Sequence, residues 1–308
     1  MPLYRTYREY LSERFPNHRQ VRKVTLDGGF TCPNIDGTKG FGGCTYCDNR
    51  SFSPAMALRG ESIRQQLDAQ IPRTLARFPD AGILAYFQPF SNTHAPLEKL
   101  AELYEAALSH PAVIGLSIGT RPDCLEDEVL ALLCQISRSH PLMLEIGLQT
   151  ANDKSLVEMN RGHTRKEFED CMQRCVQCIE SERAQGFPGF DLGTHLIVGW
   201  PSETLEDVRH TAQCVAQFPF QAVKIHPLHI VRGTKLAQAW TRGEIPLIDF
   251  EKYCQAAAII IRTLPQSTAI ERFTGDAPGD SLLAPTWCGD RNAIVNRVEQ
   301  LLRSTQSN

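Results

Sequence analysis

The strongest constraint on how this chain can fold is a repeated alternation of apolar, β-branched runs with amphipathic helical patterns. The two clearest helical patterns, at 62–78 and 95–110, place apolar residues on one helical face, and Pro72 is expected to kink or split the first. Such alternation is typical of parallel strands joined by crossover helices. The sequence therefore predicts an α/β fold, built either as an open sheet or as a partial (βα)6 barrel. The six predicted strands are 21–26, 83–88, 113–118, 142–148, 194–200 and 222–228.

Three segments are predicted along the chain: a basic helical segment at 1–20, the strand–helix repeat at 21–238, and a small C-terminal α/β extension at 239–308. In a parallel sheet of either kind, the loops that carry function gather at the carboxyl ends of the strands. We therefore expect the functional side chains at that end. The extension is expected to contain a helix, a strand and a second helix, at 249–263, 267–273 and 291–303.

Composition limits the class of protein. Hydrophobic residues make up 42% of the 308 residues and charged residues 22%, as in ordinary soluble globular proteins. No stretch approaches the roughly 18 consecutive apolar residues of a membrane span, and the charged N-terminus lacks the apolar core of a secretory signal. We therefore expect a cytoplasmic protein with no membrane partner.

Charge is unevenly distributed along the chain. The formal net charge of −3 argues against a protein that coats nucleic acid. The first 23 residues nevertheless contain six basic residues against two acidic ones. This segment is either a solvated surface helix or a contact for an anionic substrate.

Residues 27–54 are predicted to form a long loop directly after the first strand. Six glycines and two prolines in it disfavour regular helix and strand, and loops of this length inside a domain usually carry function. The loop contains the pattern Cys32-x11-Cys44-x2-Cys47. A structural zinc site needs four protein ligands, so three thiols alone favour a different centre. Three thiolates on a 4Fe–4S cluster would leave one iron open to a cofactor or substrate.

Other interpretations of these cysteines stay open. They are alternatively buried thiols without function, a redox pair at Cys44 and Cys47, or a zinc site completed by a distant ligand such as Cys288. A reducing cytosol disfavours disulfides, and because eleven is an odd number, at least one thiol would stay unpaired in any case.

A second triplet, Cys171-x3-Cys175-x2-Cys178, lies in a segment that is rich in helix formers and free of glycine and proline until Gly186. At about 100° per residue, its three thiols fall on one stripe of a helix. We therefore predict that they pack in the core, as free cysteines commonly do. An auxiliary cluster is the alternative.

Cys32, Cys44 and Cys47, with the aromatic Tyr46 before the last cysteine, resemble the signature of the radical S-adenosylmethionine (SAM) superfamily. The first gap is wider than the usual three residues, and in this it is similar to the branch that contains the catalytic subunit of Elongator. Eight motifs spread over nearly the whole chain resemble the YhcC-type family. They are GGFTCPN, GGCTYC, GTRPDC, LQTANDKSL, NRGH, HLIVGWP, HPLHIV and LLAPTWC.

The resemblance implies a TIM-like radical SAM partial barrel, a 4Fe–4S cluster on the three cysteines, and SAM bound to its open iron. One electron from the reduced cluster would cleave SAM to a 5′-deoxyadenosyl radical that takes hydrogen from a substrate. This implies a reducing partner of the flavodoxin or ferredoxin type. The Elongator likeness suggests an RNA substrate such as a tRNA base, with a small metabolite or a protein side chain as alternatives. A zinc-stabilised, non-catalytic binding protein and an iron–sulphur electron carrier are the alternatives outside this class.

The resemblance also implies which groups at the strand ends bind SAM. Gln88 and Pro89, at the end of the second strand, resemble the segment whose backbone binds the methionine amine. Thr120 ends the third strand and is expected to contact SAM. Gln149, which ends the fourth, resembles a ribose-binding glutamine, and Arg161 resembles an arginine that contacts the SAM carboxylate or ribose.

His195 lies where relatives such as oxygen-independent coproporphyrinogen oxidase carry an acidic ribose ligand, and a histidine there can donate or accept one hydrogen bond. Ile197 is expected to pack on the adenine, and Tyr46 to contact the cofactors. Glu145, within a buried strand, needs a partner, which SAM or Arg121 can supply.

Structural alternatives accompany these assignments. Arg161 can pair with Glu158 at an exposed helix end, and Gln149 can hydrogen-bond its own loop. His226 and His229, at the end of the sixth strand, are either structural hydrogen-bonding groups or contacts for a substrate.

Overall fold

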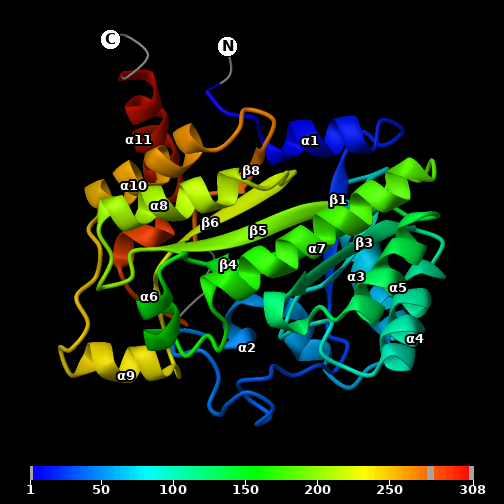
Figure 1. Ribbon diagram of the computed structural model, residues 1–308, viewed down its shortest axis with the longest axis horizontal. Helices are drawn as coiled ribbons and strands as arrows, with labels where there is room; N and C mark the ends of the chain where they lie inside the picture. Colours follow the sequence, from blue (N-terminus) through cyan, green and yellow to red (C-terminus); the bar gives the residue numbers. More distant parts are fainter. Residues whose placement is uncertain (1–2, 276–280, 305–308) are drawn as a thin grey trace.

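A curled sheet of seven parallel strands forms the centre of the computed structural model, which describes residues 3–275 and 281–304 (Figure 1). The strands are arranged in the order β1-β2-β3-β4-β5-β6-β8, so that neighbours in the sheet are neighbours along the chain. This order lacks the reversal that defines an open doubly wound sheet. The predicted partial barrel is therefore confirmed. The strands are Val21–Leu26, Gly82–Phe87, Val113–Thr120, Leu142–Gln149, Asp191–Val198, Ala222–Pro227 and Ala269–Arg272.

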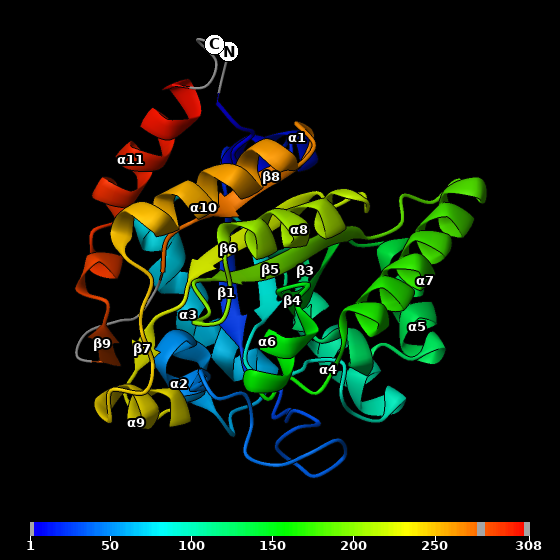
Figure 2. The same cartoon turned by 60° about the vertical axis from the view of Figure 1, so that its left-hand side comes forward.

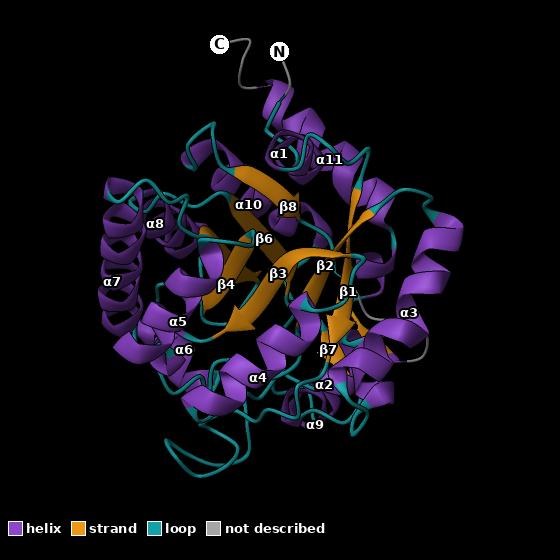
Figure 3. Cartoon of the chain, turned by 90° about the vertical axis from the view of Figure 1, so that its right-hand side faces the viewer, coloured by secondary structure: helices purple, strands orange, loops and turns teal. Residues whose placement is uncertain are grey.

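Helices cover the outside of this half-barrel (Figures 2 and 3). The covering helices are α3 (Ile63–Arg77), α4 (Leu97–Leu108), α5 (Asp127–Ser137), α7 (Arg165–Ala184), α8 (Leu205–Ala216) and α10 (Phe250–Thr263). The remaining helices and the small antiparallel pair are α1 (Tyr7–Arg14), α2 (Asn49–Phe52), α6 (Asp153–Glu158), α9 (Lys235–Thr241), α11 (Arg291–Ser304), β7 (Ile230–Val231) and β9 (Leu282–Ala284).

Local sequence rules explain where several of these helices begin. Ser62, Thr164 and Thr204 are the N-cap residues of α3, α7 and α8, and each forms a reciprocal capping box with the residue three positions later. Helix α3 continues through Pro72 as one element. Of the two expected effects of this proline, the split is therefore wrong, and the kink stays a prediction.

Burial follows from the layered arrangement. All residues of β2 and β4 are buried, because helices cover the sheet outside and side chains fill it inside. The central core combines apolar residues from the strands with the inward faces of the helices, such as Leu26, Ile83, Leu116, Leu144 and Leu196. Charged side chains that point into the half-barrel are therefore exceptions that need partners.

Two elements differ from the predicted layout. The strand expected at 267–273 forms β8 and pairs with β6, so part of the C-terminal extension belongs to the barrel sheet. The predicted loop at 27–54 ends earlier, because Asp48 caps the short helix α2 and a 3-10 helix follows at Pro54–Leu58.

The basic N-terminal segment covers the amino ends of the strands. Tyr10 Oη and Arg14 Nε both donate to Asp191, the first residue of β5, at 2.8 Å. Figure 1 shows α1 at the opposite end of the sheet from α2 and α9. This position of α1 agrees with the surface-helix interpretation and separates the helix from the strand ends where function is expected.

None of the described helices has the length and apolar character that are required to span a membrane.

Candidate functional site

A cavity of about 450 Å³ opens at the carboxyl ends of the strands, a size that suits a cofactor or small ligand. Eleven of the twelve predicted site residues line it; the exception, Pro89, is buried after β2 but does not line the cavity. The lining residues predicted from sequence are Cys32, Cys44, Tyr46, Cys47, Gln88, Thr120, Glu145, Gln149, Arg161, His195 and Ile197.

Tight backbone turns bring the three loop cysteines to the cavity. The carbonyl of Cys32 accepts from the amides of residues 35 and 36, and the carbonyl of Cys44 accepts from the amide of Cys47 at 3.1 Å. Gly43, just before Cys44, has φ +67°, a left-handed conformation that glycine adopts without strain. The Asn160 amide donates to the Gly43 carbonyl at 2.7 Å, and this bond attaches the loop to the segment after α6.

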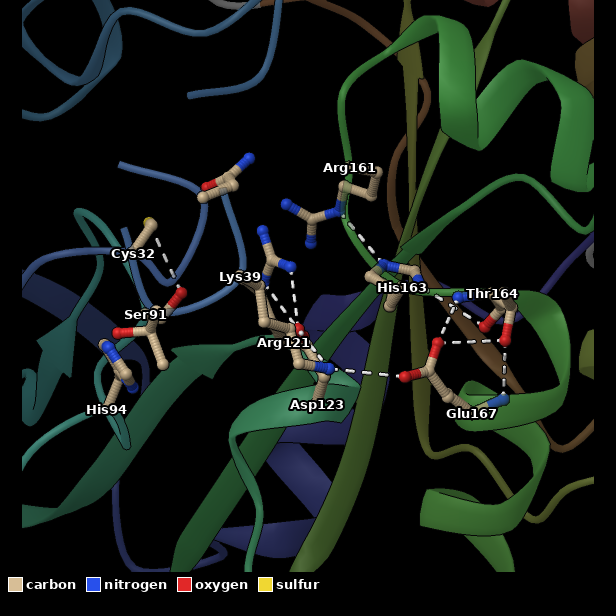
Figure 4. Close-up of polar contacts among 12 residues, drawn as sticks. Cys32, Lys39, Ser91, His94, Arg121, Asp123, Arg161, His163, Thr164 and Glu167 are labelled. Carbon is tan, nitrogen blue, oxygen red and sulfur yellow. Dashed lines mark hydrogen bonds and ion pairs between the residues drawn. The ribbon is translucent and has the colours of Figure 1, made fainter. Parts of the chain in front are cut away.

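Hydrogen-bond donors surround two of the sulphur atoms. Ser91 Oγ lies 3.3 Å from Cys32 Sγ (Figure 4), and Asn34 Nδ2 lies 3.3 Å from Cys44 Sγ. Arg161 Nη1 lies 3.6 Å from the same Cys44 sulphur. These donors stabilise negative charge on sulphur, which is the form that binds metal.

The three thiols differ in acidity. Burial tends to raise the pKa of Cys44, but the guanidinium groups of Arg161 and Arg121 bring it below its usual value. Burial and the neighbouring thiols raise the pKa of Cys47, and burial raises that of Cys32. Cys44 is therefore the thiol that ionises most readily.

Arg161 is held in a fixed orientation by neutral acceptors. Its Nε donates to His163 Nε2 at 3.1 Å, and its Nη2 donates to the Gly147 carbonyl at 3.0 Å (Figure 4 shows the first of these bonds). Burial lowers the pKa of His163 to about 3, so this imidazole is neutral at physiological pH. Among the described residues no carboxylate hydrogen-bonds Arg161, and its charge faces the cysteine loop.

The alternative pairing of Arg161 with Glu158 is wrong. Glu158 accepts instead from Trp200 Nε1 at 2.7 Å and from Ser202 Oγ at 2.9 Å. Gln149 does not bond its own loop either, since its side-chain amide makes no hydrogen bond within the part of the chain that the structure describes, and it lines the cavity with φ +76°.

Arg121 is a cavity residue that the sequence analysis did not assign to the site. It is only 2% exposed, and it forms a bidentate pair with Asp123 at 2.8 and 2.9 Å (Figure 4). Lys39 reaches the same carboxylate at 3.2 Å. Arg121 Nη1 stays buried without a partner among the described residues. The spacing of an arginine and an aspartate directly after Thr120 was the signal that could have revealed this pair.

Glu145 lies at the bottom of the cavity in an ion-pair network. Burial opposes its ionisation, but two lysines lower the pKa of this carboxyl well below its usual value. Of the two partners expected for Glu145, Arg121 is wrong, because it pairs with Asp123, and a contact with SAM stays a prediction. The two oxygens of Glu145 accept five hydrogen bonds of 2.6 to 2.9 Å, from Lys23, Tyr86, Ser117, His195 and Lys224.

Two further histidines line the cavity beside His195. His229 Nδ1 donates to the Pro227 carbonyl at 3.0 Å, as the structural interpretation expected. His226, whose ring centroid lies 5.9 Å from that of His195, makes no hydrogen bond within residues 3–275 and 281–304. Burial lowers the pKa of all three imidazoles, so they are neutral at physiological pH.

The second cysteine triplet is remote from this chemistry. Cys171 and Cys175 are buried on α7 within the main apolar core, and Cys178 packs against that core. The core-packing prediction is therefore confirmed. Cys288, the candidate fourth zinc ligand, is buried in a 3-10 helix and does not line the cavity. Among the described residues no three histidine, cysteine or carboxylate side chains converge on a point as the ligands of a single metal ion do.

The half-barrel, with a thiol-lined cavity at its carboxyl ends, has the architecture of the radical SAM class, and comparison with known proteins agrees. Residues 38–215 match the Radical SAM superfamily, and residues 220–304 match the Radical SAM C-terminal domain. The chain belongs to the radical SAM superfamily. The boundary expected at residue 239 stays a prediction.

Two relatives cover most of this chain. Protein YhcC of Escherichia coli K12 is 40% identical over 276 residues, which are 89% of this chain and 84% of YhcC. The uncharacterised protein YtqA of Bacillus subtilis 168 is 33% identical over 304 residues, or 99% of this chain and 91% of YtqA. The solved structure of archaeal Elp3 from Methanocaldococcus infernus, with residues 1–46 deleted, superposes with a TM-score of 0.64 at 17% identity, over 91% of this chain and 63% of that one, and so shows the shared fold.

Proposed function

We propose that this protein is a radical SAM enzyme, which binds a 4Fe–4S cluster through Cys32, Cys44 and Cys47 and cleaves SAM reductively. The observation that carries the proposal is the convergence of these three loop thiols on one cavity together with hydrogen-bond donors to sulphur. A structural zinc site needs four protein ligands, and the candidate distant ligand, Cys288, does not line the cavity. The three thiols therefore favour a cluster over the zinc-stabilised binding protein.

Unpaired polar atoms support a fit to the amino-acid part of SAM. Gln88 Oε1 and Asn34 Oδ1 are buried acceptors, and Arg121 Nη1 is a buried donor, each without a partner among the described residues. A buried polar atom without a hydrogen bond is costly. An ammonium group beside the two acceptors and a carboxylate beside the guanidinium would satisfy all three. The residues present therefore fit a zwitterionic ligand next to the thiols.

The chain's own residues would control charge and water around the bound groups. Arg161, Asn34 and Ser91 donate toward the sulphurs, which stabilises the anionic thiolates and tunes the potential of a bound cluster. Ile197 would supply an apolar wall for the adenine, and Tyr46 lines the cavity while it packs against the apolar cluster that contains Met159 and Trp200. When bound and reduced, the cluster supplies the electron that cleaves SAM to methionine and a 5′-deoxyadenosyl radical.

The electron must come from outside this chain, and we propose a one-electron protein donor of the flavodoxin or ferredoxin type. The case for an RNA substrate depended partly on the basic residues 1–23. Within them, α1 lies at the opposite end of the barrel from the cavity, and Lys23 is held in ion pairs with Glu145 and Glu271. The proposal therefore stops at radical formation, and tRNA is one of the substrates to be tried, together with small metabolites and protein side chains.

The test is the formation of 5′-deoxyadenosine. Protein purified without oxygen, reconstituted with iron and sulphide and then reduced should convert SAM to 5′-deoxyadenosine, detected by mass spectrometry. Cys44→Ala should lose this activity because it removes a cluster ligand, whereas Cys254→Ala, a buried thiol of α10, should keep it. A wild-type protein that takes up a full complement of iron and makes no 5′-deoxyadenosine would contradict the proposal. Zinc in place of iron would favour the binding-protein alternative.

A further inference from the structure

Glu145 and His195 lie side by side on β4 and β5, and their hydrogen bond fixes what His195 offers to a ligand. We propose that Glu145 is a positioning residue that holds His195 as an acceptor for a hydroxyl group of the SAM ribose, and that Glu145 itself does not bind SAM. This inference rests on the proposed function. It replaces the expectation that Glu145 is itself a cofactor ligand.

The carboxylate of Glu145 has no capacity left for a ligand. An ionised carboxylate presents about four lone-pair positions, and this one already accepts five hydrogen bonds. Two of the donors are the ammonium groups of Lys23 and Lys224, each 2.6 Å away, which keep the carboxylate ionised. The side chain is 1% exposed. A ligand hydroxyl could reach an oxygen of Glu145 only by displacing one of these partners.

The bond to Glu145 determines which nitrogen of His195 carries the proton. An ionised carboxylate only accepts, so the 2.6 Å contact between Glu145 Oε2 and His195 Nε2 requires the proton on Nε2. A neutral imidazole has one N–H, which leaves Nδ1 as an acceptor. Nδ1 has no hydrogen-bond partner within the described ranges, and the His195 side chain lines the cavity with 22% exposure.

The neighbourhood of His195 combines this acceptor with donors. His195 pairs in register with Gly147 on β4. A Cβ atom on Gly147 would lie 2.6 Å from Gln149 Nε2 and 2.8 Å from Arg161 Nη2, so the missing side chain leaves room for both groups. An imidazole acceptor, an amide and a guanidinium therefore lie around the same stretch of β4.

This mixture of groups selects the chemistry of the ligand. A carboxylate or phosphate oxygen would place lone pairs against the lone pair of His195 Nδ1. A hydroxyl can donate to Nδ1 and accept from Gln149 or Arg161 at the same time, and two adjacent hydroxyls can engage all three. The vicinal diol of a ribose has this pattern, whereas the amino-acid end of SAM fits the unpaired atoms near the thiols.

The first test reads the protonation of His195 directly. Protein with ¹⁵N-labelled histidine should show, by long-range ¹H–¹⁵N correlation, a protonated Nε2 and an unprotonated Nδ1 for His195, assigned by its loss in His195→Asn. In Glu145→Gln, one of the acceptor oxygens is replaced by a donor and the tautomer should no longer be fixed. Glu271→Gln is the matched control, because it removes the other carboxylate bound to Lys23 and Lys224 and should leave the His195 signals unchanged. A wild-type His195 protonated on Nδ1 would overturn the inference.

The second test measures SAM binding to the oxidised, cluster-reconstituted protein by equilibrium dialysis. His195→Ala should weaken binding of SAM about tenfold, the effect of losing one hydrogen bond in a buried site. The 2′-deoxy and 3′-deoxy analogues of SAM are measured in the same way. One of them lacks the hydroxyl that His195 contacts, and for that analogue His195→Ala should change the affinity by less than about twofold. His195→Asn, which keeps an acceptor near the position of Nδ1, should recover part of the loss.

The two proposals can fail separately. If wild-type protein binds SAM and His195→Ala binds SAM and both analogues equally well, the ribose contact is wrong and the enzyme class stands. If the reconstituted wild-type protein neither binds nor cleaves SAM, the proposed function fails, while the tautomer of His195 can still be read. A Glu145→Gln protein that unfolds does not remove the test, because the wild-type spectrum and the His195 variants decide it.

Discussion

The chain contains two cysteine triplets, which the fold places in opposite chemical surroundings. The Cys32, Cys44 and Cys47 triplet lies on an irregular loop at the cavity, and the second triplet lies on helix α7 in the apolar core. Around the first, Ser91, Asn34 and Arg161 donate toward sulphur. Around the second, the neighbours are side chains such as Phe168, Met172 and Ile179 on the same face of α7.

The two triplets also differ in the arginine beside them, Arg161 for the first and Arg174 for the second. Arg161 beside the first triplet hydrogen-bonds no carboxylate in the described chain, so its charge is available to the thiols. Arg174, on the same helix as the second triplet, donates to Asp127 at 2.8 Å and to the Leu125 carbonyl at 2.7 Å. Spacing alone would rank the second triplet as the better cluster motif of this superfamily. The surroundings reverse that order, because a cluster needs accessible, charge-stabilised thiolates.

Iron content gives the largest expected difference between the triplets. After anaerobic reconstitution, a triple alanine variant at 32, 44 and 47 should bind essentially no cluster iron, and a triple alanine variant at 171, 175 and 178 should keep the full wild-type complement. Iron and sulphide assays together with the visible absorption of the cluster measure this. Loss of iron only in the second variant, with its fold intact by circular dichroism, would invert the comparison and indicate an auxiliary or principal cluster on α7.

Thiol reactivity in the metal-free protein gives the next effect. Cys44 should react with iodoacetamide at lower pH than Cys32 and Cys47, because Arg161 and Arg121 lower its pKa while burial raises the pKa values of the other two. Cys175 should not react with iodoacetamide, since its hydrogen bond with the Cys171 thiol and its burial raise its pKa well above the usual value.

Arg161→Gln and Arg174→Gln form the matched pair for this prediction. The first should slow alkylation of Cys44 by about threefold to tenfold at neutral pH, because the fraction of thiolate falls as the pKa rises. The second should leave every cysteine of the loop unchanged. Peptide mass spectrometry resolves each site, and an equal response of Cys44 to both variants would show that the local charge of Arg161 is not the cause.

Much of this architecture could be predicted because its signals are local. Strand β1 has its predicted bounds, and helices α10 and α11 each differ from their predicted bounds by one residue. The glycine-rich loop was identified from turn formers within one segment, and the helical character of the second triplet from its lack of them. Each conclusion needed only neighbours along the chain, which is where a single sequence carries information.

Partners across the fold could not be predicted in the same way. Glu145 was correctly expected to need one, but Lys23 is 122 residues away and Lys224 is 79 residues away. Nothing in a single sequence says which buried charges meet. The basic N-terminal segment raised the same difficulty, since its position at the amino ends of the strands follows from its contacts with Asp191 and β8. Arg121 was considered only as one of two partners for Glu145, the other being SAM, although its actual partner, Asp123, is two residues away.

Removing the thiols of the second triplet should destabilise the fold more than removing those of the first, which is the opposite of their expected effects on iron binding. In the metal-free protein, the triple alanine variant on α7 should lower the free energy of unfolding by about 2 kcal/mol, because it removes buried sulphur atoms and leaves small cavities. The triple variant in the loop should cost less than about 1 kcal/mol, since those thiols are half-buried at an open cavity. Urea unfolding followed by circular dichroism gives both values, and equal losses would contradict the assignment of α7 to the core.

The smallest expected effect is a loss of folding stability at low pH. It should come from His163, which accepts a hydrogen bond from Arg161 next to the first triplet. Burial lowers the pKa of His163 to about 3 in the folded protein, against about 6.5 when unfolded. The unfolded state therefore binds the proton more tightly, so the contribution of His163 is complete above pH 6.5 and is lost progressively as pH falls toward 3. This residue alone should remove about 1 kcal/mol between pH 7 and 5.5.

His163→Gln tests that assignment, because glutamine does not titrate but can still accept from Arg161 Nε. Urea unfolding at both pH values should show a pH-dependent loss of stability smaller by about 1 kcal/mol in the variant than in the wild type. His140→Gln, at an exposed position on the loop after α5, is the control for replacing a histidine away from the cavity. If His163→Gln and wild type lose the same stability between these pH values, the acid-sensitive group lies elsewhere. The contrast between the surroundings of the two triplets would then depend on the arginines and thiols alone.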